Sequence, residues 1–576
     1  MRKFLTLLAM LILVQAAFSE TRTVMVDGYC YLEGRSVHSE TKVKFIKVSP
    51  SAITDSTYTD SSGYFFISGL YAGIYDVEYT HIDFETVIVE DVVILGDMTL
   101  PPQTLLCARF LSDSLSGTLG PGCYRIVGDI TINPNDSLHI LPGTSFMFIG
   151  PYAFRIYGTL LAEGTESDSI KFTTDQSGEN RWRGLRFEGA ASSGSRLAYC
   201  PVERSYDASG DGGGVYCSSS SPTFTNCTVI GNSVSASGYR STYAYGGGIY
   251  CSSSSPAFTN CTVSGNSVSA SGYYNSDAYG GGVYCSSSSP AFTNCTISGN
   301  SVSANSSSRN GYVYGGGVWC YDHSSPTLTN CTISGNSARY GGGVYCSSSS
   351  PTFENCILSG NSAAEGGGAL CWSSSPIFNS TIIAFSTGSG IRFENSASSQ
   401  ISYCDFFGNS GGNIGHPSQG PPMIGVPLVI NANADSADIY MNISLDPMFA
   451  DTAAGDYHLT DFSHCIGAGD PADTVSTDFE GDPRPNPSWS YPDIGADEHW
   501  SGSPVLHLVV SILSGNARLH WTPFGAGPYS IYGATEPYAT GTLLATVSDT
   551  TTWTDEETAS RPSRYFYYVT SEWPSR

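Results

Sequence analysis

The pattern of apolar and polar positions along this chain predicts short β-strands. Residues 21–100 alternate apolar and polar positions with a period of two, as in the segment Val43–Val48. Residues 129–132, 137–140 and 146–148 are again short apolar-rich runs, separated by turns rich in Pro, Asn, Asp and Gly. The pattern therefore predicts an all-β protein.

The middle of the chain is a repeat. Gly-Gly-Gly begins at positions 212, 246, 280, 315, 341 and 366, so that successive copies lie 34, 34, 35, 26 and 25 residues apart. Each unit of about 25 residues holds three short strands and polar turns, and three units carry about nine extra residues before the glycines, which we expect to form loops. A helical repeat would need Ala- and Leu-rich stretches, which the Ser-Ser-Ser-Ser-Pro segments would break. The repeat predicts a right-handed parallel β-helix, a solenoid that resembles the pectate lyase fold.

The repeat also resembles that of the chlamydial polymorphic outer-membrane proteins, which pairs an FxxN motif with GGA and an aliphatic residue. The FxxN place is taken by Val263–Asn266, Ile297–Asn300 and Ile333–Asn336, and Gly367–Leu370 matches the second motif fully. This chain departs from that family in having Val or Ile for Phe and two Cys in each rung. No translocating-barrel pattern follows the repeats, so we do not expect the autotransporter route of that family.

The N-terminal region predicts export and a small sandwich. Residues 1–19 have the basic start, the apolar run Phe4–Val14 and the small-residue cleavage site of a signal peptide. Thr59–Ile67 and Gly69–Val77 then resemble the turn and strand of the carboxypeptidase regulatory-like (transthyretin-like) family. This resemblance implies a non-catalytic β-sandwich over residues 20–103.

The solenoid is expected over residues 104–445, with a cap and a second sandwich after it. Asp493–Glu498, in the predicted cap segment 446–502, resembles the DIGAxE ending of many secreted bacterial β-helix proteins. Because a solenoid must cover its last open rung, this segment is the natural cap. Residues 503–576 resemble a fibronectin type III domain, which implies a spacer.

Composition narrows the classes of function. Charged residues make up only 13% of the chain and the formal net charge is −26. Such an excess of negative charge repels phosphate backbones, so nucleic acid is excluded as a partner. No second apolar run of membrane-spanning length follows the signal peptide. We expect a bacterial protein that is secreted or displayed at the cell surface, in association with the outer membrane.

The first candidate site is an aromatic ladder. In each Val-Tyr-Cys strand, alternation places Val and Cys inside the solenoid and the aromatic ring outside. One ring per rung, about 4.8 Å apart, predicts a flat aromatic strip on which pyranose rings would pack. The alternative is a stack that only stabilises the solenoid. The ladder comprises Tyr216, Tyr250, Tyr284, Trp319 and Tyr345.

The second candidate site lies in the three insertions. Consecutive rungs with similar insertions place those segments side by side, and Tyr, Ser, Gly and Asn are residues that adaptable binding surfaces favour. Packing against the solenoid wall is the alternative. The candidate ligand-binding residues here are Tyr239, Tyr243, Tyr273, Tyr274 and Tyr312.

Cysteine and asparagine recur in register. The Cys series are interpreted as buried thiols, with disulfides between or within rungs as the alternative. Zinc is not expected, because the repeats have no CxxC pair and little His. The Asn series predict ladders that bond along the stack. The Cys series are 217, 251, 285, 320, 346, 371 and 227, 261, 295, 331, 356; the Asn series are 226, 260, 294, 330, 355 and 232, 266, 300, 336, 361.

Catalysis finds little support in the sequence. Val318–His323 resembles a strand motif of pectate lyases, but that chemistry needs a base and acidic calcium ligands. Between residues 205 and 410 there is no Lys. We therefore name no catalytic and no metal-binding residue, and keep Asp322 and His323 only as a local binding spot. No cofactor is expected; Asp207–Asp211 offers alternating carboxylates to calcium, with an acidic turn as the alternative.

These observations predict an exported, non-catalytic β-solenoid that acts as an adhesin or glycan-binding protein through a tyrosine-rich face. Its partner would be a polysaccharide or a glycan on a host or neighbouring surface. Two alternatives stay open: a polysaccharide lyase or hydrolase acting in the groove of the solenoid, and a purely structural protein of the cell envelope.

Overall fold

The computed structural model describes residues 23–33, 35, 37–49, 53–175, 181–239, 241–273, 275–306, 311–395, 399–486, 490–499, 508–513, 516–521, 529–535, 542–548, 552–556, 560–561 and 565–571. The predicted signal peptide lies outside these residues. Within them the regular structure is β-strand, apart from two short 3₁₀ helices, Ala190–Gly194 and Pro417–Gln419. This part of the chain contains no helix long and apolar enough to cross a membrane. The chain divides into two compact units, Met1–Ala291 with Gly299–Val313 and Phe292–Ser298 with Tyr314–Arg576.

The first unit begins with a two-sheet sandwich. One sheet has the order β4 (Tyr64–Tyr71), β1 (Thr23–Leu32) and β7 (Met98–Thr99), and β8 (Gln103–Leu105) also pairs with β1. The other has the order β3 (Thr54–Tyr58), β2 (Lys42–Ser49), β5 (Gly73–Thr80) and β6 (Val87–Ile94). The period-two pattern turns one face of each strand inward, so that Val26, Phe45, Phe65 and Tyr79 form the core.

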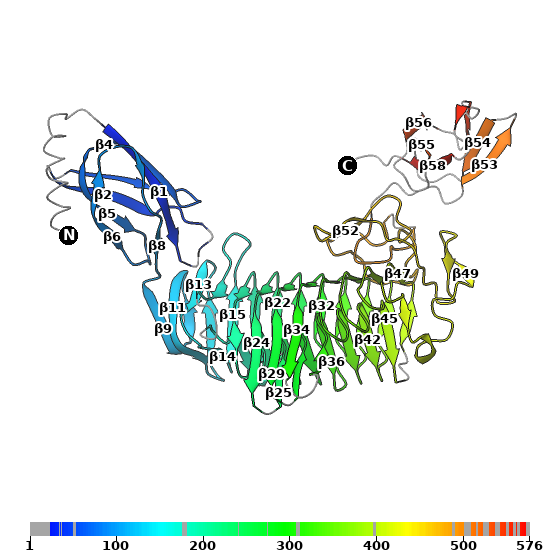
Figure 1. The fold of residues 1–576 in the computed structure, drawn as a ribbon, viewed down its shortest axis with the longest axis horizontal. Helices are drawn as coiled ribbons and strands as arrows, with labels where there is room; N and C mark the ends of the chain where they lie inside the picture. Colours follow the sequence, from blue (N-terminus) through cyan, green and yellow to red (C-terminus); the bar gives the residue numbers. More distant parts are fainter. Residues whose placement is uncertain are drawn as a thin grey trace. The chain divides into compact units, whose positions relative to one another are not determined.

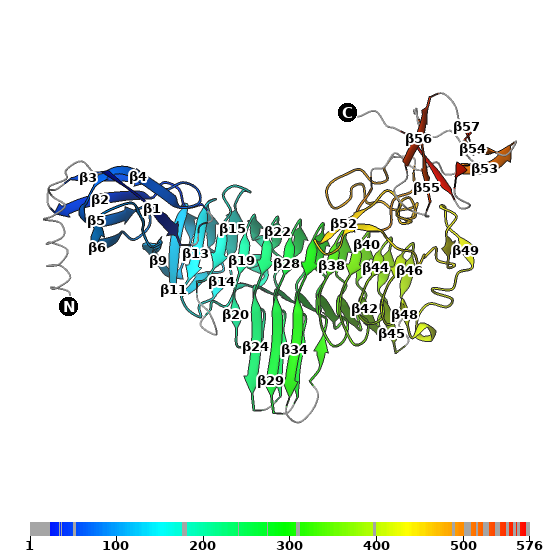
Figure 2. The same cartoon turned by 45° about the horizontal axis from the view of Figure 1, so that its top comes forward.

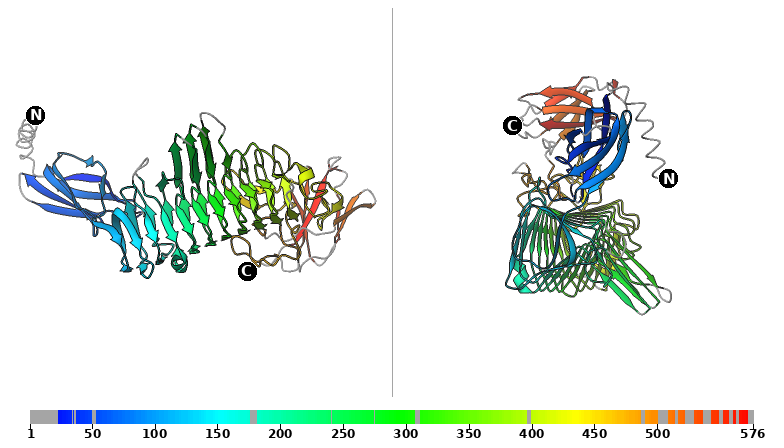
Figure 3. Two further views of the ribbon diagram at one scale, coloured as in Figure 1. Left: turned by 90° about the horizontal axis from the view of Figure 1, so that it is seen from below. Right: turned by 90° about the vertical axis from the view of Figure 1, so that its left-hand side faces the viewer.

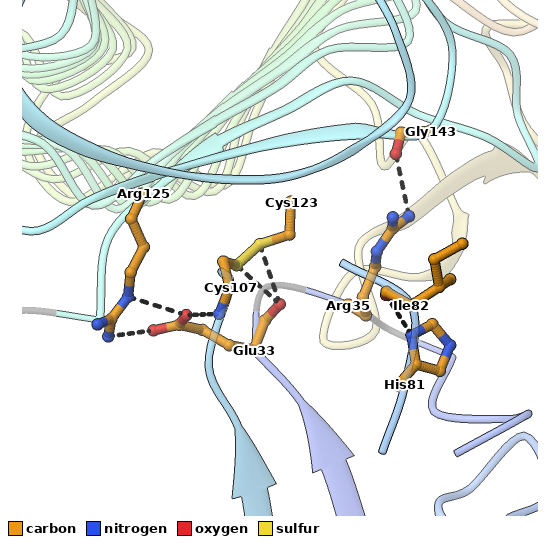
Figure 4. Close-up of a disulfide and its surroundings, with 8 residues drawn as sticks. All are labelled: Glu33, Arg35, His81, Ile82, Cys107, Cys123, Arg125 and Gly143. Atoms are coloured by element: carbon orange, nitrogen blue, oxygen red, sulfur yellow. Dashed lines mark hydrogen bonds and ion pairs between the residues drawn. A yellow bond between two sulfur atoms is a disulfide. The ribbon is translucent and has the colours of Figure 1, made fainter. Parts of the chain in front are cut away.

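A disulfide and a buried ion pair connect this sandwich to the first solenoid strands. Cys107 and Cys123 are bonded, with their Cα atoms 5.3 Å apart (Figure 4). Glu33, at the end of β1, accepts a hydrogen bond from the Cys107 N–H at 2.7 Å and pairs with Arg125 at 2.9 Å. The Glu33 side chain is 5% exposed, so its charge depends on Arg125 for compensation.

The rungs of the first unit are stacks of short parallel strands (Figure 1). In one repeat, β21, β22 and β23 pair in register with β26, β27 and β28 of the next repeat. The predicted rung of three short strands is therefore confirmed. The strands are β9 (Arg109–Ser114), β10 (Gly117–Leu119), β11 (Gly122–Ile132), β12 (Ser137–Ile140), β13 (Thr144–Phe148), β14 (Phe154–Ile156), β15 (Thr159–Glu163), β16 (Lys171–Thr173), β17 (Leu185–Glu188), β18 (Arg196–Ala198), β19 (Pro201–Glu203), β20 (Tyr206–Asp207), β21 (Val215–Ser218), β22 (Thr223–Thr225), β23 (Thr228–Ile230), β26 (Ile249–Ser252), β27 (Ala257–Thr259), β28 (Thr262–Ser264) and β31 (Val283–Ser286).

The interior of the rungs is filled by residues that recur in register. Val215, Cys217 and Phe224 are at most 1% exposed, and Phe224 stacks on Phe258 of the next rung at 4.7 Å. The repeat cysteines are buried thiols, which supports the interpretation as small core residues over the disulfide alternative. Gly247 allows neighbouring rungs to approach closely, since a Cβ at this position would lie 2.5 Å from the Gly281 carbonyl oxygen.

The predicted Asn ladders are confirmed. Asn232, Asn266 and Asn300 are fully buried, and their side-chain amides hydrogen-bond from rung to rung at 2.9–3.0 Å. Asn226 and Asn260 instead occupy turns with φ of 51° and 53°, a left-handed conformation that Asn tolerates better than most residues.

The three insertions are not loops, as the sequence led us to expect, but strands. They form β24 (Ser233–Gly238), β29 (Ser267–Gly272) and β34 (Ser301–Ser306) in one parallel sheet, and β25 (Thr242–Tyr245) and β30 (Ser276–Tyr279) in a second. These strands stand out from the neighbouring rungs as a two-layered fin (Figures 2 and 3). The insertions form strands because Val and Ala alternate with Ser along them, so that Val234, Ala236 and Ala244 are buried between the two sheets.

The second unit repeats the same rung. β39, β40 and β41 pair in parallel with β42, β43 and β44. The strands are β33 (Thr296–Ser298), β36 (Val318–Tyr321), β37 (Thr327–Thr329), β38 (Thr332–Ser334), β39 (Val344–Ser347), β40 (Thr352–Glu354), β41 (Ile357–Ser359), β42 (Ala369–Trp372), β43 (Ile377–Asn379), β44 (Ile382–Ala384), β45 (Ile391–Glu394), β46 (Gln400–Ser402), β47 (Asp405–Phe407) and β48 (Ile414–Gly415); β32 (Ala291–Thr293) and β35 (Val313–Tyr314) span the boundary between the units.

The segment after these rungs folds back onto them. Ile443, Leu459 and Ile494 form one buried cluster with Ile357 and Ile382 of the rungs. The strands here are short: β49 (Val429–Ile430), β50 (Ser436–Ala437), β51 (Phe449–Asp451) and β52 (Asp456–Leu459). The Asp493–Glu498 motif is held by carboxylates that accept backbone hydrogen bonds and by a fully buried ion pair between Arg484 and Glu498.

The C-terminal residues that the structure describes form two three-stranded sheets. One has the order β53 (Leu508–Leu513), β54 (Asn516–Trp521) and β57 (Thr552–Asp555), and the other β56 (Thr542–Val547), β55 (Tyr529–Ala534) and β58 (Phe566–Ser571). Leu519, Trp521 and Ile531 are fully buried in the core of this region.

Candidate functional site

The fin presents a group of exposed tyrosines, here called the fin tyrosines: Tyr239, Tyr243, Tyr273 and Tyr312. Their exposed fractions are 73%, 46%, 46% and 53%. Tyr239 and Tyr273 follow β24 and β29 directly, and their rings stack at 5.3 Å. The Tyr312 N–H donates a hydrogen bond to Asp277, which is opposite Tyr243 in register. Four of the five insertion tyrosines thus lie on the fin as two pairs, Tyr239 with Tyr273 and Tyr243 with Tyr312; Tyr274 lies outside the described residues.

The fin and the ladder form one aromatic surface. Tyr245 lies 6.5 Å from Tyr243 on its own strand and stacks on Tyr279 of the next at 5.2 Å, between ring centroids. The same Tyr245 ring contacts Tyr250 and Tyr284 of the ladder at 6.4 and 5.0 Å. The two candidate sites predicted separately from the sequence therefore meet at Tyr245, itself one of the insertion tyrosines.

The ladder has the predicted stacking but not the predicted exposure. Tyr216, Tyr250 and Tyr284 stack at 4.8 Å with ring planes within 9° of parallel. Yet Tyr284 is only 6% exposed, because Tyr245 covers it. In the second unit Trp319 and Tyr345 are 6% and 7% exposed, and Tyr314 lies against both. The expectation of an aromatic strip outside the solenoid is therefore wrong for Tyr284, Trp319 and Tyr345, whereas Tyr216 and Tyr250 are half-buried.

Stacking also changes what the ladder can bind. A pyranose packs on the face of an aromatic ring, but in a 4.8 Å stack each ring face is occupied by the neighbouring ring. The accessible parts are the ring edges and the phenol hydroxyls. Burial is the main cause that raises the pKa of Tyr250 and of Tyr284 above the ordinary value, so these phenols stay neutral hydrogen-bonding groups.

An arginine closes the ladder at its N-terminal end. The Arg186 guanidinium lies 4.2 Å from the centre of the Tyr216 ring, and Arg186 pairs with the buried Asp207 at 3.0 Å. Asp207 also accepts a hydrogen bond from the Ser209 N–H. Burial raises the pKa of Asp211, with Arg186 opposing and Asp207 adding to the shift. In the Asp207–Asp211 turn, which the sequence offered as a calcium site, one of the two carboxylates is therefore already paired with Arg186.

Asp322 and His323, in the second unit, lie on the exposed turn after β36. Both have a left-handed backbone, with φ of 52° and 60°, and the His323 N–H donates to the Ser348 carbonyl. Asp322 takes the place of Ser219, Ser253 and Ser348 of other rungs, which share this backbone conformation. The pair is explained as a variant of the common turn.

Two groups in the second unit were missed by sequence reasoning. A pocket of about 640 Å³ is lined by Gln400, Ser402, Gln419 and Tyr440 among others. Elsewhere, His458 hydrogen-bonds to Asp456 and Glu480 at 2.5 and 2.9 Å. Burial lowers the pKa of His458, but these two bonds outweigh it and raise the pKa to about 9. His458 thus forms ion pairs with Asp456 and Glu480, and the ligand atoms of His458, Glu480 and Asp497 lie within 4.8 Å of one another, close enough to hold a metal ion.

A family model described as a right-handed beta helix region matches residues 273–420. Together with the stacked parallel strands, it confirms the predicted right-handed parallel β-helix. The resemblances to the chlamydial repeat and to the two sandwich families stay predictions.

No curated protein matches the chain. Among solved structures, a type II cohesin–X-dockerin complex from Acetivibrio cellulolyticus aligns at 24% identity over 15% of this chain and 58% of that chain, with a TM-score of 0.13. The chain therefore spans less than two thirds of that first structure. Pectate lyase Pel9A aligns at 14% identity over 62% of this chain and 89% of that chain (TM-score 0.27). The catalytic domain of a GH87 alpha-1,3-glucanase aligns at 10% identity over 69% of this chain and 86% of that chain (TM-score 0.25). These scores are too low to carry an argument about function.

Proposed function

We propose that this protein is an exported, non-catalytic β-solenoid that binds neutral polysaccharide through the fin tyrosines, as an adhesin or glycan-binding protein at the cell surface. The observation that carries the proposal is the clustering of Tyr239, Tyr243, Tyr273 and Tyr312 on one projecting element, each close to half exposed or more. A packed solenoid does not need such a cluster for stability.

The chemistry of the cluster favours a hydroxyl-rich, uncharged ligand. Tyr supplies large contact area at a low cost in side-chain entropy, and its hydroxyl both donates and accepts hydrogen bonds. Polyanions are disfavoured by the net charge of −26. Tyr239 is 73% exposed, so that much of its ring surface is available to a sugar. The ladder beneath supports the fin and contributes hydroxyls and ring edges.

The test is retention of the mature chain on a panel of insoluble and soluble polysaccharides, with and without calcium, while product formation is followed in the same samples. Wild type should be retained on at least one neutral polysaccharide without releasing products. A variant with Tyr239, Tyr243, Tyr273 and Tyr312 changed to Ala should lose retention by about tenfold or more, since aromatic contacts each contribute about 1 kcal/mol.

A matched control uses exposed tyrosines far from the fin in sequence. Tyr58, in the N-terminal sandwich, is 59% exposed, and Tyr58→Ala should leave retention unchanged. Product formation would contradict the proposal and return attention to Asp322 and His323. Absence of retention on every polysaccharide, in a folded protein, would favour a structural protein of the envelope instead.

A further inference from the structure

Three side chains that can ligate a metal ion converge in the second unit. They are here called the cap triad: His458 on β52, Glu480 on the turn at residues 478–482, and Asp497 in the Asp493–Glu498 motif. One ligand atom from each lies within 4.8 Å of the other two. The sequence named no metal-binding residue, because these three come from separate segments outside the repeats.

His458 is held in the orientation of a metal ligand. Its Nδ1 lies 2.5 Å from the Asp456 Oδ1, and its Nε2 lies 2.9 Å from the Glu480 Oε2. The ring also packs against Phe479, with the ring centroids 5.4 Å apart. In metal sites of proteins, the imidazole nitrogen that does not bind the ion is almost always held by a carboxylate, a carbonyl or a water. Asp456 holds Nδ1 in this way, so that Nε2 is directed at Glu480.

Asp497 supplies a buried carboxylate with an unused oxygen. The residue is 3% exposed, and its Oδ2 accepts a hydrogen bond from the Leu459 N–H at 2.7 Å. Among the described residues no other hydrogen bond or ion pair reaches this side chain, so that Oδ1 has no partner there. Burial raises the pKa of Asp497, since a carboxylate held away from water is costly to charge without a cation. This unused oxygen points to a bound cation independently of the pairs around His458.

The acidic turn beside the triad positions Glu480 rather than adding ligands. Asp478 lies in this turn and is fully buried. Its Oδ1 accepts hydrogen bonds from the backbone N–H groups of residues 480, 481 and 482, each at 2.9 Å. Its Oδ2 accepts one from the Glu498 N–H at 3.1 Å. The backbone that carries Glu480 is therefore fixed, while the Glu480 side chain, 47% exposed, can adjust to an ion.

We propose that the cap triad binds a divalent transition metal ion, with zinc as the best fit. Zinc accepts imidazole nitrogen and carboxylate oxygen at about 2.0–2.2 Å, and sites with three protein ligands complete the shell with water. Calcium instead takes about six to eight oxygen ligands and would gain little from His458. As zinc binds, the imidazole proton leaves to solvent, and the ion takes over the positive charge that faces Glu480 and Asp497. The ion would then join three segments of the cap that are far apart in the sequence.

The test is calorimetric titration of the mature full-length chain with zinc, after metals have been removed with a chelator. Wild type should bind one zinc ion per chain at this site. Glu480→Gln removes an exposed ligand without disturbing the core and should weaken binding by at least about tenfold. Asp456→Asn should weaken binding by about tenfold, because it no longer accepts the Nδ1 proton of His458 as a carboxylate does.

The matched control is His464→Gln in the same segment. His464 also pairs with a carboxylate, Asp435 at 2.8 Å, but it belongs to no group of three metal-ligating side chains among the described residues. Its variant should bind zinc like wild type. Cobalt in place of zinc should give no thiolate-to-metal absorption band, which separates the triad from the buried cysteines. Zinc should also slow amide hydrogen exchange at residues 456–459, 478–482 and 493–498 of native wild type, but not of Glu480→Gln.

A wild type that binds no zinc would overturn the proposal. So would a Glu480→Gln variant that binds zinc as tightly as wild type, a thiolate band with cobalt, or loss of binding in His464→Gln. Circular dichroism of each variant must match wild type, which excludes misfolding as the cause of lost binding. The variant with the four fin tyrosines changed to Ala should bind zinc like wild type, so that failure of glycan binding and failure of zinc binding are separate results.

Discussion

Replacement of Asn266 by Ala tests whether the buried amide ladder holds successive rungs together. The Asn266 Oδ1 accepts hydrogen bonds from the backbone N–H and the Nδ2 of Asn232, both at 3.0 Å. The Asn266 Nδ2 donates to the Val229 carbonyl at 2.9 Å. All of these groups are buried away from solvent. The Asn266 Nδ2 also donates to the Asn300 Oδ1 at 2.9 Å, so Asn266→Ala removes four buried hydrogen bonds, while the Asn232 Nδ2 keeps its bond to the Val202 carbonyl.

Each buried group that loses its partner costs about 1–3 kcal/mol, and relaxation of the rung recovers part of this. We expect Asn266→Ala to lower the free energy of unfolding of the first unit by about 3–6 kcal/mol. The assay is guanidinium unfolding of the full chain followed by circular dichroism, with hydrogen exchange to locate the loss in the rungs next to Asn266. Both are needed, since a repeat protein with flanking domains need not unfold in one step.

The matched control is Asn260→Gly in the same repeat. Asn260 is exposed and has a φ of 53°, which Gly adopts without strain, so the change should stay within about 0.5 kcal/mol. A loss below about 1 kcal/mol for Asn266→Ala would refute the reasoning, because water or neighbouring groups would then satisfy the freed donors.

Three further changes follow from the same structure. Glu33→Gln leaves Arg125, 16% exposed, without its charged partner, and should lower the free energy of unfolding by about 2–4 kcal/mol, measured by thermal unfolding. The control Glu78→Gln removes a carboxylate from the more exposed pair with Lys44 and should change that free energy little. Equal effects of the two substitutions would contradict this prediction. Burial raises the pKa of Asp405 from 3.8 to about 8, so the folded state holds this proton more tightly: its contribution to stability is greatest below about pH 4 and is lost as the pH rises to about 8. Asp405→Asn should flatten that part of the pH profile of unfolding, and an unchanged profile would contradict the assignment. Removal of calcium with a chelator should leave polysaccharide retention unchanged, since Asp207 is paired with Arg186; loss of retention would contradict it.

The rungs could be predicted because their signal is local and repeated. Glycines 34 residues apart, Val-Tyr-Cys strands and paired Asn positions specify the same register in each copy, and Tyr216, Tyr250 and Tyr284 do lie in one column. The fin strands carried a signal too. Val234 and Ala236 recur in register as Val268 and Ala270, but the position of this alternation inside insertions led us to expect loops.

The exposure of the ladder could not be predicted, because it depends on contacts between distant segments. Nothing near Tyr284 in the sequence indicates that Tyr245 covers it. The disulfide between Cys107 and Cys123 was not predicted, because neither residue belongs to the repeat and no pattern in the sequence pairs them. The fin tyrosines could be chosen as candidates from composition, whereas their union with the ladder required the structure.

The most direct test of the central claim compares polysaccharide retention of wild type with that of the variant in which the four fin tyrosines are Ala, with turnover followed in the same samples. The account predicts retention of wild type on a neutral polysaccharide, a loss of about tenfold or more in the variant, and no product from either. Equal retention of the two proteins, or release of sugars by wild type, would contradict it.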